Sequence, residues 1–250
     1  MRKILKQYLD LEEHILLMIK AQFFIQLVGS AFFLILNIYL AKQGFTDPEI
    51  ANFISYRFLA VMLLAFPLGF FIKGKSLRPF FILGSLGVPV VAICLILSIQ
   101  NGFHQYLTLF FVLWGIVFTL FQVCSLPYIM RNTEVCRQSH AISLSYATYS
   151  FGTILSGLMI FCFSHIFQQI NEGVILLFIS VFGFAGVYYL LKMKVDVVDP
   201  ADAIFQYRGY DWKLLLKAII PTLVIAIGAG LTIPFINLFF FHNFLVDSSV

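Results

Sequence analysis

Seven apolar stretches, each about as long as a membrane is thick, constrain this chain more than any other feature. A hydrocarbon core of about 30 Å needs roughly 20 apolar residues in helical conformation. The stretches are too long for the strands of a membrane barrel and lack their two-residue alternation, so helices are predicted. The predicted spans are Ile15–Ala41, Ile50–Ile72, Phe80–Ile99, Tyr106–Met130, Ala141–Phe163, Val174–Leu191 and Leu214–Phe241.

The composition supports the same fold class. Of 250 residues, 61% are hydrophobic and 11% are charged, whereas a soluble domain has roughly 45–50% apolar and about 25% charged residues. So few charges cannot cover a water-soluble globule, which excludes a soluble enzyme and a nucleic-acid-binding module. We therefore predict an all-α polytopic membrane protein, without enzymatic activity, whose surroundings are the lipid bilayer.

The cysteines give no sign of a metal site or a disulfide framework. Cys94, Cys124 and Cys162 lie in apolar runs, and Cys136 lies in a polar loop. No close cysteine or histidine spacing of the kind that binds zinc connects them. We predict no disulfide, no metal and no cofactor.

The positive charges predict the orientation. Of the 16 Lys and Arg residues, Lys20 and Arg57 lie inside spans, thirteen lie on one side of the predicted membrane, and Lys42 alone lies on the other. The positive-inside rule therefore places the N-terminus in the cytoplasm. We expect a multi-pass protein of the cell membrane, plasma or bacterial inner. The first apolar run is too long for a cleaved signal sequence and is predicted to be an uncleaved span.

One longer polar segment divides the chain. We predict a six-helix bundle over residues 1–192, a cytoplasmic linker over 193–213, and the first helix of an incomplete second bundle over 214–250. Polar segments of mixed charge between apolar blocks are typical of domain boundaries.

The first and seventh spans resemble each other at an offset of 200 residues. Leu36–Leu40 reads LNIYL and Ile236–Phe240 reads INLFF, so that Asn37 and Asn237 coincide. Because both spans cross the membrane in the same direction, the repeat is parallel and each unit contains six spans. Further matches at this offset are Gly29 with Ala229, Ser30 with Gly230, Asp47 with Asp247 and Ile50 with Val250.

Over its whole length the chain resembles the major facilitator superfamily, whose halves are parallel six-span units. Local similarities lie in Pro127–Asn132, at the end of the fourth span, in His140–Leu144, at the start of the fifth, and in Gly228–Phe235 of the seventh. The resemblance implies a secondary transporter that moves a small organic solute by alternating access. It also implies a truncated or split copy, whose partner would be the missing C-terminal half.

One loop departs from the pattern of that superfamily. Between the second and third spans the family places an Asp followed by a second Gly, whereas Lys73 and Ser76 occupy these positions here, after the retained Gly69. The salt-bridge latch centred on that Asp therefore cannot be carried over. The loop keeps its basic character, which suits a topological anchor.

Arg57 is the first candidate for substrate binding. An ionisable residue within a bilayer costs several kcal/mol or more and is a functional candidate by default. Arg57 lies about seven residues into the second span. Two interpretations stay open: a charge that binds an anion or substrate in a cavity, or a long side chain that reaches the outer interface.

Polar side chains on other spans complete the predicted substrate cavity. Gln22, Gln26 and Asn37 follow roughly one face of the first span. The remaining candidates are Gln122 on the fourth span, Tyr146 and Tyr149 on the fifth, and Asn237 on the seventh. Hydrogen bonds between helices and anchoring at the membrane interface are the alternatives.

Other functions stay open. No Asp or Glu lies well inside a predicted span, so the sequence does not reveal a proton-coupling residue. A seven-span receptor or sensor is one alternative, although the charge bias opposes an external N-terminus. An inactive half-carrier that needs a partner chain is another.

Overall fold

The computed structural model describes residues 11–166, 171–194 and 211–244, and every regular element within them is helical. Seven helical segments are long and apolar enough to cross a membrane. The prediction of an all-α polytopic membrane protein with seven spans is therefore confirmed. The elements are α2 (Glu13–Lys42), α3 (Asp47–Phe71), α4 (Arg78–Gln100), η1 (His104–Tyr106), α5 (Leu107–Asn132), α6 (Val135–Ile166), α7 (Glu172–Lys192), α8 (Trp212–Thr232), η4 (Ile233–Phe235) and α9 (Ile236–Phe244).

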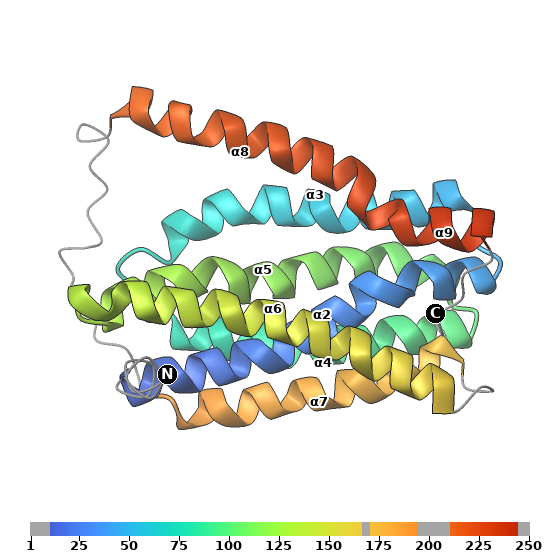
Figure 1. Cartoon of the computed structure of the whole chain (residues 1–250), viewed down its shortest axis with the longest axis horizontal. Coiled ribbons are helices and arrows are strands. Elements are labelled where there is room, and N and C mark those ends of the chain that lie inside the picture. Colours follow the sequence, from blue (N-terminus) through green and yellow to red (C-terminus); the bar gives the residue numbers. More distant parts are fainter. Residues whose placement is uncertain (1–10, 167–170, 195–210, 245–250) are drawn as a thin grey trace.

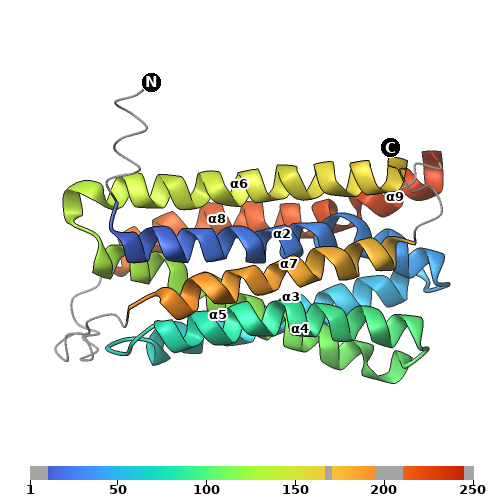
Figure 2. The ribbon, with the colours of Figure 1, turned by 90° about the horizontal axis from the view of Figure 1, so that it is seen from below.

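The first six spans lie roughly parallel to a common axis (Figures 1 and 2). Packing runs in the order α3, α5, α4, α7, α2, α6, and α2 also contacts α4. Because α5 and α6 make few contacts with each other, an opening is left between these two helices. We call the two ends of the bundle the Glu13 end and the Lys42 end, after the first and last residues of α2.

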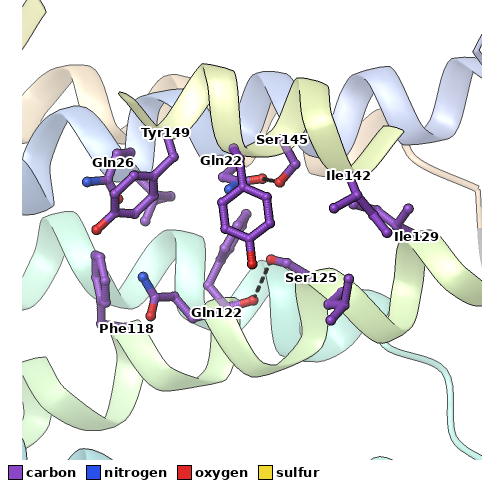
Figure 3. A pocket seen from close by; sticks show the side chains of 13 residues that line it. Gln22, Gln26, Phe118, Gln122, Ser125, Ile129, Ile142, Ser145 and Tyr149 are labelled. Carbon is purple, nitrogen blue, oxygen red and sulfur yellow. Dashed lines mark hydrogen bonds between the residues drawn. The ribbon is translucent and has the colours of Figure 1, made fainter. Parts of the chain in front are cut away.

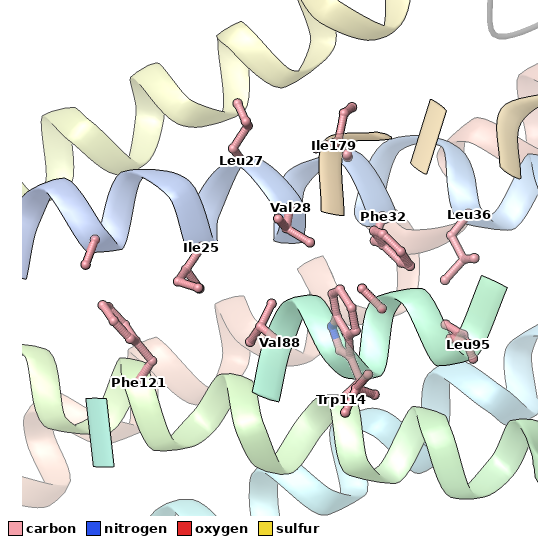
Figure 4. Close-up of a cluster of buried hydrophobic side chains, with 14 of the residues drawn as sticks. Ile25, Leu27, Val28, Phe32, Leu36, Val88, Leu95, Trp114, Phe121 and Ile179 are labelled. Carbon is pink, nitrogen blue, oxygen red and sulfur yellow. The ribbon is translucent and has the colours of Figure 1, made fainter. Parts of the chain in front are cut away.

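Helix α2 is the most enclosed helix in the described part of the chain, with 78% of its apolar window buried. Its Phe32 ring stacks on Trp114 of α5 at a centroid distance of 4.5 Å, in the apolar cluster of Figure 4. A close approach by α7 also holds it, since a Cβ at Gly186 would lie 3.2 Å from the Ala21 carbonyl oxygen. Within a bilayer, such close packing takes over the role that hydrophobic burial has in water.

The seventh span is interrupted near Pro234. Helix α8 ends at Thr232, a 3-10 turn follows, and α9 continues to Phe244. The helical segment begins two residues before the predicted Leu214 and ends three after Phe241, and its part that is apolar enough to cross a membrane is Ile219–Phe244. The break lies at the proline, a usual cause of helix kinks. Helix α9 packs on α2, whereas α8 is largely exposed (Figure 1).

Several predictions concern residues outside the described ranges. Residues 195–210 of the predicted linker 193–213 lie outside the described ranges, so the role of the linker as a domain boundary stays a prediction. The same holds for four of the positive residues and for two of the repeat matches. They are Arg2, Lys3, Lys6, Arg208, Asp247 and Val250.

Candidate functional site: a polar groove between α2, α5 and α6

The opening between α5 and α6 forms a groove whose floor is α2, with a cavity of about 320 Å³ (Figure 3). This volume lies at the lower end of the range for small-molecule sites. Five of the eight residues predicted to form a substrate cavity line it. The lining is Gln22, Ile25 and Gln26 of α2, Phe118, Phe121, Gln122, Ser125, Leu126 and Ile129 of α5, and Ile142, Ser145, Tyr146 and Tyr149 of α6.

The lining is largely apolar with several neutral polar groups, and it carries no formal charge. It combines three glutamine amides, two serine hydroxyls and two tyrosine hydroxyls with apolar side chains. Figure 3 shows Gln122 and Tyr149 projecting into the space between α5 and α6. Both are exposed, Tyr149 at 39%, and Gln122 makes no hydrogen bond within the described residues. Its amide can therefore both donate to and accept from a solute.

The two glutamines of α2 also hold α6 in place. Ser145 donates a hydrogen bond to Gln22 Oε1 at 2.7 Å. Gln26 Nε2 donates to Ser30 Oγ at 2.7 Å, and Thr153 of α6 lies 2.9 Å from that oxygen. Both interpretations of this polar stripe therefore apply: it bonds two helices and it lines the groove.

Arg57 lies at the deep end of the groove without lining it. It is ten residues from the first residue of α3, about 15 Å along the helix axis at 1.5 Å per residue. Because the exposed, charged residues Asp47 and Glu49 lie outside the hydrocarbon, Arg57 is about 10 Å deep in a core of about 30 Å, seven residues beyond Ile50. The guanidinium carbon is 5.7 Å from the Trp114 ring centroid and 5.8 Å from that of Phe118. The side chain thus points sideways toward α5, not along α3 toward the interface.

No acid neutralises Arg57 in the part of the chain described. Its contacts there are cation–π contacts, including one to its neighbour Phe58 at 5.6 Å. Phe118 connects Arg57 to the groove, because its ring faces the guanidinium and Phe118 also lines the cavity. The backbone of α3 comes very close at this point, since a Cβ at Gly115 would collide with the Arg57 carbonyl oxygen.

Asn37 and Asn237 lie outside the groove and bind each other's helices. Asn37 Nδ2 donates to the Pro234 carbonyl oxygen at 2.5 Å, and Asn237 Nδ2 donates to the Leu34 carbonyl oxygen at 2.7 Å. The structure therefore places these two predicted cavity residues in a contact between α2 and the η4–α9 segment, toward the Lys42 end. The reason is tertiary: each short amide side chain reaches a backbone carbonyl of the other helix where the two helices cross closely.

Sequence reasoning missed a buried ion pair at the Lys42 end. Lys42 Nζ lies 2.5 Å from Glu172 Oε1, and the Glu172 side chain is only 7% exposed. Glu172 lies two residues before the predicted span Val174–Leu191, whereas the structure makes it the first residue of α7. No specific signal for this pair is present in the sequence, because Asp47 and Glu49 lie at the same end as Glu172.

A second pair at the same end joins α9 to α3. His242 Nε2 lies 3.1 Å from Asp47 Oδ1, and both side chains are about half exposed. Together with the two asparagines, this contact fixes α9 against the first six spans at the Lys42 end. Among the described residues, no group of His, Cys, Asp and Glu could hold a metal ion.

Comparison with protein-family models gives no match, and comparison with curated proteins gives none either. Interpretation of the groove therefore rests on its own geometry. Three features define it: a lining without formal charge that combines apolar side chains with amides and hydroxyls, a cation beyond its deep end, and a contact between Asn37 and Asn237 toward the Lys42 end of the bundle.

Proposed function

We propose that this protein is a membrane secondary transporter of the major facilitator type, which moves a small organic solute by alternating access. The observation that carries the proposal is the reciprocal bonding of Asn37 and Asn237. The two donors are 200 residues apart, and so are the two acceptors, Leu34 and Pro234. The contact therefore obeys the same offset as the sequence repeat.

Reciprocal contacts of this kind arise between equivalent surfaces related by an approximate two-fold axis. Helix α2 and the α8–α9 segment would then be equivalent first helices of two units. Parallel six-span units related by an axis along the membrane normal are the plan of facilitator transporters, with the substrate site near the midplane. The groove ends at Tyr149 and Phe118, close to that depth.

The polarity of the groove also favours a transporter. Amide and hydroxyl groups that faced lipid tails would lose their hydrogen bonds with water, at a cost of several kcal/mol for each group left unsatisfied. Gln122 and Tyr146 are exposed on the groove surface, so a water-filled cavity suits them better than lipid. With the Glu13 end assigned to the cytoplasm by charge, the groove would open inward while the asparagine contact closes the outer end.

The transporter proposal can be separated from a receptor or an inactive half-carrier by thiol accessibility. In a variant without native cysteines, Gln122→Cys would be labelled with a membrane-impermeant thiol reagent, applied to either side of sealed vesicles in turn. We expect labelling from both sides, because alternating access exposes the groove to each in turn. The matched control is Val90→Cys, an exposed apolar position in the middle of α4, where lipid would prevent reaction.

The asparagine contact supplies the second part of the test. Asn37→Ala together with Asn237→Ala should raise labelling of Gln122→Cys from the Lys42 side and lower it from the Glu13 side. A receptor or a half-carrier would give labelling from one side only, unchanged by the two asparagine substitutions. That result would refute the proposal.

A further inference from the structure

We propose that Arg57 binds a carboxylate at the deep end of the groove, and that the preferred solute is a monovalent organic anion with a flat apolar body. The inference rests on the proposed function for transport, but the binding site stands on its own geometry. It names the class of solute that the groove would carry.

The charge balance of the membrane interior is the first argument. Within the described spans, the acids lie at helix ends: Glu13, Asp47, Glu49 and Glu172. Arg57 is therefore without a compensating acid at membrane depth, where an unpaired charge costs several kcal/mol or more. Aromatic faces offset part of this cost. A bound anion would offset more, because an Arg–carboxylate pair forms two parallel charge-assisted hydrogen bonds.

A buried hydrogen-bond donor without an acceptor belongs to one of the rings that face Arg57. The indole N–H of Trp114 is fully buried and has no hydrogen-bond partner, and its ring is one of those that face the guanidinium. An unsatisfied buried donor costs about 1–3 kcal/mol. A second donor that needs an acceptor thus belongs to the same aromatic cluster as the unpaired cation.

The rings and apolar side chains of the groove indicate what the body of the solute is like. Phe118 contacts Arg57 with its ring and also lines the groove, and Tyr149 faces it from α6. Aromatic side chains of this kind stack on flat apolar groups. Ile25, Phe121 and Leu126 continue an apolar wall, while Gln122 offers hydrogen bonds to one polar substituent. One cation beyond a lining without formal charge suits a solute with a single negative charge.

The competing explanation is that Arg57 only ties α3 to α5 through ring contacts. The other intramembrane cation of the described residues, Lys20, provides a matched control. It is exposed, lies 5.8 Å from the Tyr189 ring centroid and does not line the groove. Removal of its charge should leave anion binding unchanged, whereas removal of the Arg57 charge should not.

The test uses the fluorescence of Trp114 in the full chain. The chain has two tryptophans, so Trp212→Phe leaves Trp114 as the sole reporter. The purified protein in detergent would be titrated with benzoate, with the neutral isostere benzamide and with the cation benzylamine, at constant ionic strength. We expect a saturable change with benzoate, at least about tenfold weaker binding of benzamide, and no saturable response to benzylamine.

The variants extend the same titration. Arg57→Gln should weaken benzoate binding at least about tenfold, Arg57→Lys should weaken it less, and Lys20→Gln should have no effect. Equal binding of benzoate and benzamide by the protein that carries only Trp212→Phe would overturn the proposal, even if Arg57→Gln failed to fold. An equal saturable response to chloride alone would also overturn it, because the apolar body would then contribute nothing.

The outcomes separate this inference from the proposed function. Selective benzoate binding with one-sided thiol labelling would support the anion site and refute the transporter. Two-sided labelling without selective benzoate binding would support the transporter and refute the anionic solute.

Discussion

Loss of the reciprocal asparagine bonds should detach α9 from α2. Asn37→Ala removes the hydrogen bond to Pro234, and Asn237→Ala removes the hydrogen bond to Leu34. Asn37 is only 5% exposed, so water has little access to compete for its hydrogen bond. The double variant keeps the apolar contact of α9 but loses both directional interactions.

The size of the effect follows from hydrogen bonds measured between membrane helices, which average about 0.6 kcal/mol and reach about 1.7 kcal/mol. Each single substitution should therefore raise the fraction of detached α9 about threefold at the average value. The double substitution should raise it about eightfold, and at most about 300-fold, since about 1.4 kcal/mol corresponds to a factor of ten.

The reaction of a thiol at residue 238 measures this fraction. Leu238 on α9 is 4% exposed, so Leu238→Cys in a cysteine-free background should react with a water-soluble reagent only after detachment. Its labelling rate should rise by the factors above when the asparagines are substituted. The neighbouring Phe239→Cys, at a position that is 57% exposed, should react at an unchanged rate. An unchanged rate at residue 238 in the double variant would show that the two bonds do not hold α9.

Two further predictions concern the helix packing. Gly115→Ala should lower the thermal unfolding midpoint, because the new Cβ would collide with the Arg57 carbonyl oxygen. Overpacking of this kind costs about 1–3 kcal/mol of unfolding free energy. The control is Gly69→Ala, whose Cβ would meet nothing within 4 Å and which should leave the midpoint unchanged or slightly higher. Glu172→Gln should destabilise the fold, because it breaks the ion pair with Lys42, and adding Lys42→Gln should cost much less than the first substitution. Additive costs in this double-mutant cycle would contradict a coupled pair.

The sequence determined the number and position of the spans. A stretch such as Phe80–Ile99 matches the thickness of the hydrocarbon core and carries no charge, so a membrane helix is its only satisfactory state. These properties are local and follow from composition. The interruption at Pro234 did not follow in this way, because other prolines lie inside continuous helices. They are Pro67, Pro89, Pro127 and Pro221.

The groove was only partly predictable. The spacing of Gln22 and Gln26 placed both on one face of a helix, and that face does line the groove. Asn37 continues the same face toward the Lys42 end, yet it bonds to Pro234 instead. Helical periodicity fixes which residues share a face but not which neighbour covers that face at each level.

Sequence alone therefore fixed seven apolar helices, the 200-residue repeat and the list of polar candidates. Only the tertiary structure decided their partners: Arg57 faces the rings of α5 instead of the interface, and Glu172 is buried beside Lys42. The physical reason is that hydropathy is a property of each segment. Pairing of polar groups, in contrast, depends on how closely helices distant in sequence approach one another.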